Sequence, residues 1–184
     1  ITGFRLAPGG AQEYFGVRAD LVTFGKIIGG GMPVGAYCGS RALLEQVAPC
    51  CPVYQAGTLS GNPVAMAAGL AQLTYLREHP EVYEHINARG AALAEGLREL
   101  VQRTVVINQL GSLLAPFFTP TAVTTCTDAK GSDVAKYARY FQGMLERGVA
   151  LAPAQFEAMF VSEAHTQAEL DATLAAAEAV FQTL

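Results

Sequence analysis

The stretch TFGKIIGGGMPVGA, residues 23–36, carries most of the information about the fold. An apolar run that ends at Phe24 predicts a buried strand, and residues 34–39 predict a second one. Lys26 stands just after the first of these strands and is followed by two isoleucines and three glycines. A lysine at the mouth of a buried strand is expected to be partly desolvated, which favours its free amine over the ammonium form.

Two interpretations of Lys26 follow from this local pattern. A free amine can attack an aldehyde and form a Schiff base, and the neighbouring glycines leave room for a planar group beside the backbone. Alternatively, the lysine reaches solvent from the end of a strand, as many lysines do. A P-loop is excluded, because Asp20 and Ile27 stand where that motif needs a glycine and a serine or threonine.

A second glycine-containing loop precedes a helix that we expect from residue 63 to about residue 78. Asn62 is a typical N-cap, and a proline suits the first helical position that follows it. Gly57 and Thr58 in the loop could offer backbone N–H groups and a hydroxyl to a phosphate. An ordinary glycine-rich loop that leads into a helix cap is the alternative. The helix is apolar nearly all round, which predicts burial on several sides.

The rest of the chain mixes helical and extended patterns. Helices are expected from Pro80 through Leu100, from residue 134 to a stop at Gly148, and after a capping box at residues 166–169. Strands are expected at residues 105–107, 113–118, 149–152 and 159–161. Pro116 would remove a ladder donor from the second of these strands. The mixture predicts an α/β fold in two domains, residues 1–79 and 80–184.

Composition narrows the classes of protein that fit this chain. It has 184 residues, of which 51% are hydrophobic and 15% charged, with a formal net charge of −4. The negative charge argues against a nucleic-acid surface, and the apolar runs are too short to span a membrane. The four cysteines and three histidines lack ligand spacing, so we expect no metal site. Reduced thiols favour a cytoplasmic protein.

Two segments resemble the class-III, pyridoxal-phosphate-dependent aminotransferases. Residues 23–36 are similar to the segment that carries their cofactor lysine, and residues 54–63 (YQAGTLSGNP) are similar to their phosphate loop. Within that class, residues 2–5, 9–12, 52–58, 151–153 and 156–158 resemble the group that acts on glutamate-1-semialdehyde as an aminomutase, whereas Ala154, Gln155 and Met159 depart from its loop. The resemblance extends along essentially the whole chain.

The resemblance implies the C-terminal half of a fold-type I pyridoxal-phosphate-dependent transferase. Residues 1–79 would be the C-terminal part of the large cofactor-binding domain, ending its sheet, and residues 80–184 the small α/β C-terminal domain. Because the chain opens on Ile1, we interpret it as a fragment. The first third is then expected to expose strand edges and apolar surface.

The resemblance also implies a role for four residues and one cofactor, pyridoxal 5'-phosphate. Lys26 would bind the cofactor covalently and shuttle protons between the substrate carbon and the cofactor. Gly57 and Thr58 would bind the cofactor phosphate of the neighbouring subunit, so that a homodimer shares its active sites. Glu157 would lie on a loop of the small domain and face the substrate.

The implied activity is that of an isomerase. It would move an amino group between adjacent carbons of glutamate-1-semialdehyde and give 5-aminolevulinate, a precursor of porphyrins. Two alternatives stay open: another class-III ω-aminotransferase with a two-substrate cycle, and a non-catalytic small domain or dimerisation fragment. As a fragment, the isolated chain is expected to be inactive, because further cofactor-binding residues would lie upstream.

Overall fold

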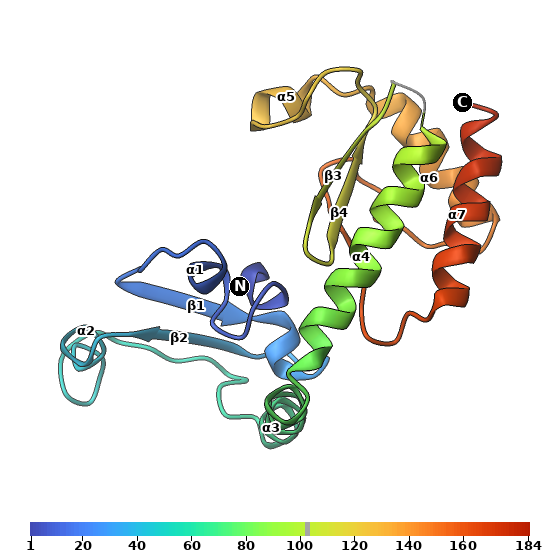
Figure 1. Cartoon of the computed structure of the whole chain (residues 1–184). Coiled ribbons are helices and arrows are strands. Elements are labelled where there is room, and N and C mark those ends of the chain that lie inside the picture. Colours follow the sequence, from blue (N-terminus) through green and yellow to red (C-terminus); the bar gives the residue numbers. More distant parts are fainter. Residues whose placement is uncertain (102–103) are drawn as a thin grey trace. The chain divides into compact units, whose positions relative to one another are not determined.

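The chain divides into two compact units. The computed structural model describes residues 1–101 and 104–184, and the units are Ile1–Tyr83 and Glu84–Leu184 (Figure 1). Tyr83, the last residue of the first unit, is bonded within that unit: its hydroxyl donates to the Phe4 carbonyl at 3.0 Å. Within the described ranges, no helix combines the length and apolar character needed to cross a membrane.

The first unit contains a two-stranded antiparallel sheet. Its strands are β1 (Leu21–Gly25) and β2 (Gly35–Gly39), as the sequence predicts, with Leu21 opposite Gly39. The expectation of two buried strands is wrong, because each strand pairs on one side only: β1 alternates between exposed and more buried residues, and β2 is exposed throughout. The helices of this unit are η1 (Thr2–Arg5), α1 (Ala11–Tyr14), η2 (Lys26–Gly29), α2 (Arg41–Leu44) and α3 (Pro63–Glu78).

Helix α3 begins where its capping residue predicts. The Asn62 carboxamide oxygen accepts hydrogen bonds from the N–H groups of Val64 and Ala65, both at 3.1 Å. The expected burial on several sides is not found, because α3 packs mainly on the four-residue helix η2. Its buried residues are Ala65 and Gly69. Its large exposed apolar side chains lie on two sides of the helix: Met66, Leu70 and Leu73, which we call the α3 apolar face, and on the opposite side Val64 and Tyr75.

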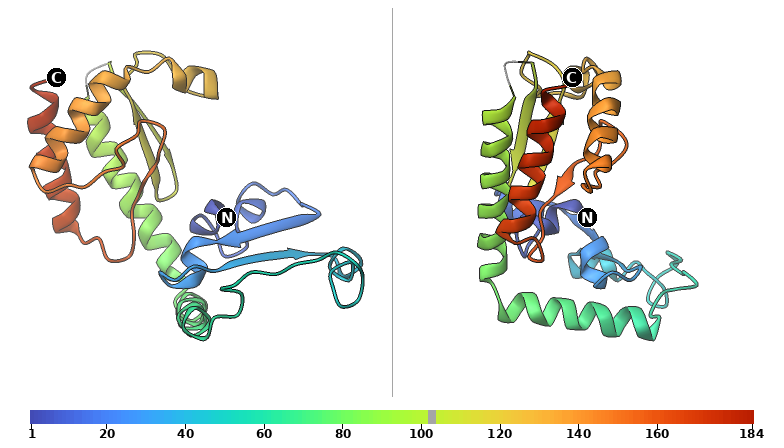
Figure 2. Two further views of the ribbon diagram at one scale, coloured as in Figure 1. Left: turned by 180° about the vertical axis from the view of Figure 1, so that it is seen from behind. Right: turned by 90° about the vertical axis from the view of Figure 1, so that its right-hand side faces the viewer.

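The second unit is a three-stranded antiparallel sheet with helices alongside it (Figure 2). The strand order is β3–β4–β5, with β4 in the centre. The strands are β3 (Val106–Leu110), β4 (Leu113–Phe117) and β5 (Met159–Phe160). The helices are α4 (Glu81–Leu100), which begins in the first unit, α5 (Cys126–Lys130), α6 (Val134–Glu146) and α7 (Gln167–Phe181).

The core of the second unit lies between the sheet and the three longer helices. Tyr140 of α6 is fully buried, and its ring stacks on Phe181 of α7 with centroids 5.1 Å apart. The cluster contains Leu93, Leu97, Ile107, Leu114, Tyr137, Tyr140, Met144, Leu170 and Val180, among others. The predicted capping box at Thr166 and Glu169 is confirmed. Apolar residues from five elements, α4, β3, β4, α6 and α7, therefore meet in one core.

The predicted strand at residues 149–152 is wrong. The segment has no regular secondary structure and pairs with no described strand, and its backbone is bonded to helix α6. The Val149 N–H donates to the Met144 carbonyl at 3.0 Å, and the Tyr137 hydroxyl donates to the Ala152 carbonyl at 2.6 Å.

Pro116 lies in β4 without removing a hydrogen bond between β4 and β3. The N–H and C=O groups of residues two apart on a strand point to the same side. The Ser112 carbonyl accepts from the Val161 N–H at 3.0 Å, so this side of β4 faces β5. The Pro116 nitrogen also points to the β5 side. Pairing with β5 ends at Leu114, however, so no residue of β5 lies opposite Pro116. The missing donor therefore costs β4 no hydrogen bond to β3, and it lies on the edge where pairing with β5 has ended.

Candidate active site

Lys26 occupies the junction between β1 and η2. Among the described residues it is the non-glycine position with a positive φ, 55°. Such a backbone is uncommon outside glycine and gathers at functional sites. The Lys26 Nζ donates to the Thr2 hydroxyl at 3.1 Å, and the side chain is otherwise exposed. The partial desolvation expected for this lysine is therefore not found, because β1 is covered on one edge only.

Glycines bring the turn after Lys26 against α3. A Cβ at Gly30 would stand 2.7 Å from the Ala68 carbonyl oxygen, and a Cβ at Gly69 would stand 2.8 Å from the Ile28 carbonyl oxygen. Both distances are shorter than any side chain tolerates, so the two backbones meet where neither carries a Cβ. The glycines that follow Lys26 thus place its turn against the middle of α3.

Gly57 and Thr58 lie in the exposed loop that leads into α3. The Ser60 N–H donates to the Gly57 carbonyl at 2.9 Å, and the Asn62 N–H donates to the Leu59 carbonyl at 3.1 Å. These two turns bring the loop to the N-cap of the helix. Among the hydrogen bonds of the described chain, none uses the Thr58 hydroxyl. The loop therefore presents a hydroxyl and backbone N–H groups at the positive end of a sixteen-residue helix.

Lys26 is not hydrogen-bonded to the loop that carries Gly57 and Thr58 within the described part of the first unit. The Lys26 turn meets α3 at Gly69, and at about 1.5 Å per residue that point is roughly 10 Å along the axis from the Asn62 cap. In the two described ranges, no hydrogen bond or ion pair connects Lys26 with Gly57 or Thr58.

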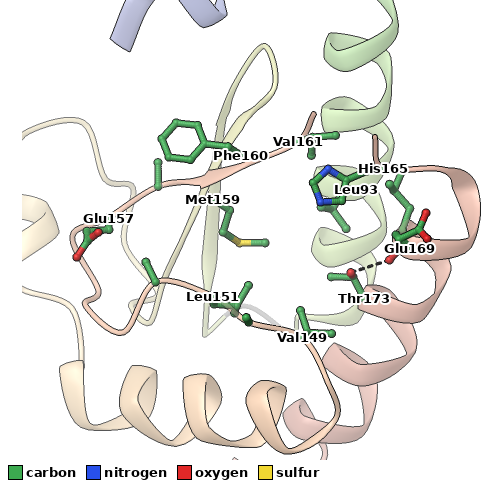
Figure 3. Close-up of a pocket in the computed structure, with 14 residues that line it drawn as sticks. Leu93, Val149, Leu151, Glu157, Met159, Phe160, Val161, His165, Glu169 and Thr173 are labelled. Atoms are coloured by element: carbon green, nitrogen blue, oxygen red, sulfur yellow. Dashed lines mark hydrogen bonds between the residues drawn. The ribbon is translucent and has the colours of Figure 1, made fainter. Parts of the chain in front are cut away.

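Glu157 belongs to the second unit and lies at the rim of a pocket of about 340 Å³ (Figure 3). The Glu157 side chain is exposed, and its N–H donates to the Ala154 carbonyl at 3.2 Å. Burial, and next the nearby Glu157 carboxylate, raise the pKa of the Tyr137 hydroxyl. The pocket is mostly apolar, and its polar lining residues are Glu157, His165, Glu169 and Thr173.

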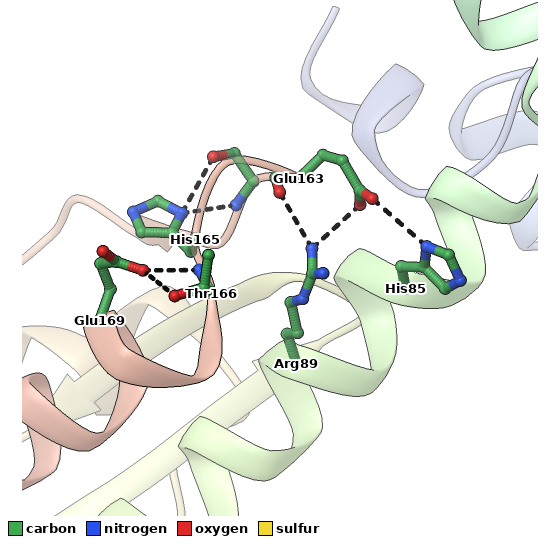
Figure 4. Close-up of polar contacts among 7 residues, drawn as sticks. His85, Arg89, Glu163, His165, Thr166 and Glu169 are labelled. Carbon is green, nitrogen blue, oxygen red and sulfur yellow. Dashed lines mark hydrogen bonds and ion pairs between the residues drawn. The ribbon is translucent and has the colours of Figure 1, made fainter.

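A polar cluster fixes the loop between β5 and α7 (Figure 4). Arg89 of α4 donates to both the carboxylate and the carbonyl of Glu163, each at 3.1 Å. His85 pairs with the same carboxylate at 3.3 Å. This cluster and the pocket were not predicted, because the residues are more than 70 positions apart. The signal in the sequence was the capping box after Glu163, which locates the loop but not its partners.

Comparison with known proteins places this geometry in a family. A model of the class-III aminotransferases matches residues 2–179. The chain belongs to the class-III aminotransferase family. Proteins named glutamate-1-semialdehyde 2,1-aminomutase are similar to it: that of Ruminiclostridium cellulolyticum is 62% identical and that of Alkaliphilus oremlandii 58% identical, each over 97% of this chain. The chain spans 42% of the length of these two relatives.

Solved class-III aminotransferase structures share the fold. A β-phenylalanine aminotransferase from Variovorax paradoxus superposes with a TM-score of 0.88 at 31% identity, covering 100% of this chain and 43% of that chain. An ω-transaminase from Sphaerobacter thermophilus gives 0.85 at 28% identity, covering 99% and 42%. The expected α/β transferase fold is therefore confirmed.

Pyridoxal phosphate is the cofactor that membership of the class-III aminotransferase family implies, and the residues present fit it. The Lys26 amine is accessible and is held on a left-handed backbone turn, so its position is set by the fold and not by a flexible strand end. Thr58 offers a free hydroxyl beside a helix N-terminus, which is the donor set that a phosphate needs. The assignment of Lys26, Gly57, Thr58 and Glu157 to particular roles stays a prediction.

Proposed function

We propose that the protein containing this chain is a pyridoxal-phosphate-dependent aminomutase that converts glutamate-1-semialdehyde to 5-aminolevulinate for porphyrin synthesis. The observation that carries the proposal is the 51–62% identity, along nearly the whole chain, to relatives that bear the aminomutase name.

Each proposed residue contributes to this reaction. Bound pyridoxal phosphate supplies a carbon that carries the amino group and a ring that withdraws electrons from the substrate. Lys26 would hold the cofactor through its Nζ atom. As a free amine, the same Nζ would carry a proton between the substrate and the cofactor. The Thr58 hydroxyl and the backbone around Gly57 donate hydrogen bonds to the phosphate. Glu157 accepts hydrogen bonds from the amino group of the substrate.

The proposal includes a homodimer with shared active sites. Two observations support it: in the described part of the chain no hydrogen bond or ion pair joins Lys26 to Thr58, and the α3 apolar face is exposed. Leu70, on that face, is 69% exposed, an unusual state for a leucine on a helix with few polar neighbours. Four free cysteines support a cytoplasmic location.

Sedimentation of the full-length protein tests the dimer. Leu70→Glu places a charge on the α3 apolar face and should convert the dimer to a monomer. Leu145→Glu is the matched control, because Leu145 is an exposed leucine on α6, 45% accessible. A dimer that survives Leu70→Glu would remove the α3 apolar face from the interface.

Product analysis tests the activity. The full-length protein, loaded with cofactor, is given glutamate-1-semialdehyde with no other amino donor or acceptor, and 5-aminolevulinate is the expected product. Lys26→Ala should abolish turnover, whereas Lys130→Ala on α5 should leave it unchanged. Turnover that requires a second amino compound would establish the ω-aminotransferase alternative. Because the chain spans 42% of its relatives, we expect the 184 residues alone to be inactive.

A further inference from the structure

The ladder between β4 and β5 stops just before Glu157. Its register places Leu113 opposite Phe160 and Leu114 opposite Met159. Continued by two more residues on each strand, the same register would place Pro116 opposite Glu157. The residue proposed to face the substrate therefore lies two positions beyond Met159, the last paired residue of β5.

Pro116 lacks the N–H group that the next hydrogen-bonded pair of the β4–β5 ladder would need. The Ser112 carbonyl accepts from the Val161 N–H, so in an antiparallel ladder every second pair from this one exchanges hydrogen bonds. Residues 116 and 157 would form one of these hydrogen-bonded pairs, and the pair requires an N–H group at residue 116. Pro116 has none, so the Glu157 carbonyl cannot be bound in that way.

The Gln155 side chain binds the Pro116 carbonyl, which the Glu157 N–H would bind in a continued ladder. Its Nε2 donates to the Pro116 carbonyl at 2.6 Å, in place of the Glu157 N–H, which turns back to the Ala154 carbonyl at 3.2 Å. A side chain thus satisfies the carbonyl that a strand would otherwise use. This leaves the Glu157 backbone outside the sheet and its carboxylate exposed.

The Gln155 side chain occupies this position at an energetic cost. Gln155 is 4% exposed, and within the described chain its Oε1 is a buried oxygen without a hydrogen-bond partner. An unsatisfied buried amide oxygen is unfavourable, so local stability alone does not account for a glutamine there. Earlier in the same loop, the Tyr137 hydroxyl donates to the Ala152 carbonyl at 2.6 Å. The segment that carries Glu157 is therefore held at Ala152 and at Gln155.

We propose that Pro116 and Gln155 are positioning residues that end the β4–β5 ladder and hold Glu157 out of the sheet, where its carboxylate meets the amino group of the substrate. The part that concerns the substrate rests on the function proposed above. The part that concerns the backbone rests on the hydrogen bonds of the second unit alone.

Hydrogen exchange in the full-length protein tests the backbone part. Gln155→Met keeps the length of the side chain and removes its donor, so the amides of residues 156–158 should exchange about tenfold faster, the effect of losing one buried hydrogen bond. Pro116→Val restores an N–H, which should itself be protected because it can now bind the Glu157 carbonyl. Gln142→Met is the control, since Gln142 bonds to Glu146 on the exposed surface of α6. Unchanged exchange at Glu157 in Gln155→Met, together with an unprotected amide at position 116 in Pro116→Val, would overturn the proposal.

Kinetics of the same variants test the substrate part. Gln155→Met should raise KM for glutamate-1-semialdehyde about tenfold and change kcat less than about twofold, because ground-state and transition-state contacts are lost together. In a Glu157→Gln background the same substitution should have no further effect, since it acts through that carboxylate. An equal loss in both backgrounds would overturn the positioning role. If the unaltered enzyme does not use this substrate, the proposed function fails, and hydrogen exchange alone still decides the backbone part.

Discussion

Gly90 in α4 lies so close to the turn between β3 and β4 that a Cβ there would stand 2.7 Å from the Gly111 carbonyl oxygen. The helix and the hairpin meet backbone to backbone at this point. Gly90→Ala should therefore destabilise the second unit by about 1–3 kcal/mol, even though alanine favours the helix by about 1 kcal/mol. The measurement is thermal unfolding followed by the near-ultraviolet signal of the buried tyrosines.

Gly96→Ala is the matched control in the same helix. A Cβ at residue 96 would meet the methyl groups of Leu174, the nearer at 2.6 Å, and these can move aside because they end a flexible side chain. Its effect should stay within about 1 kcal/mol of zero. An unaltered unfolding temperature for Gly90→Ala would show that α4 and the hairpin can separate without cost.

Tyr83 ties the start of α4 to the first unit through the Phe4 carbonyl. Burial, and next the charge of Glu13, raise the pKa of the Tyr83 hydroxyl to about 12. The folded state thus favours the neutral phenol, and the resulting stability is present below pH 10 and is lost as the pH rises from 10 to 12. Tyr83→Phe should lower the free energy of unfolding by about 1–2 kcal/mol. Tyr54→Phe, at an 83% exposed position, should not.

Denaturant unfolding between pH 7 and pH 12 measures both effects of Tyr83. The difference between the unaltered chain and Tyr83→Phe should shrink above pH 10, where the phenol of the unfolded chain ionises. A constant difference over the whole range would contradict the raised pKa of Tyr83.

Asp128 closes the capping box of the short helix α5. Hydrogen bonds from the backbone N–H groups of Thr124 and Thr125, and next from their hydroxyls, lower the pKa of the Asp128 carboxyl to about 2. A lowered pKa in the folded state stabilises the fold above the unfolded pKa of about 4. This contribution should be lost as the pH falls from 4 to 2.

Nuclear magnetic resonance of the Asp128 carboxyl measures its titration directly. Asp128→Asn removes the titrating group, so the stability gap between the two proteins should narrow as the pH falls through this range. A midpoint near pH 4 for Asp128 would mean that the capping box does not hold the carboxylate.

Thr58 offers its hydroxyl in the loop before α3. In the full-length protein, Thr58→Val keeps the shape of the side chain and should weaken cofactor binding about five- to thirtyfold, the effect of one hydrogen bond to a charged group. Ser60→Ala removes a neighbouring hydroxyl and should change binding less than about twofold. Titration with pyridoxal phosphate compares the two, and equal losses would contradict the specific role of Thr58.

Local structure was predictable from the sequence to within a few residues. Asn62 and Pro63 located the start of α3, and the capping box at Thr166 and Glu169 located the start of α7. Each of these signals is complete within one turn of helix, because the orphan N–H groups are satisfied by side chains two or three residues away. The motif around Lys26 was sufficient for the family, since it depends on consecutive residues.

Long-range relationships were not predictable in this way. Nothing in the pattern around Gln155 indicates that its amide reaches Pro116, 39 residues earlier, or that Arg89 reaches Glu163, 74 residues later. Periodicity also predicted a buried α3, whereas the exposure of a helix depends on which surfaces are present to cover it.

The sequence by itself determined the family, the glycines that follow Lys26, and the ends of the helices, because these depend on covalent neighbours and backbone sterics. Only the tertiary structure decided where the β4–β5 ladder stops and hence why Glu157 is exposed. Strand register depends on how side chains from distant segments pack on a sheet, and a proline interrupts a ladder only on the edge to which its nitrogen turns.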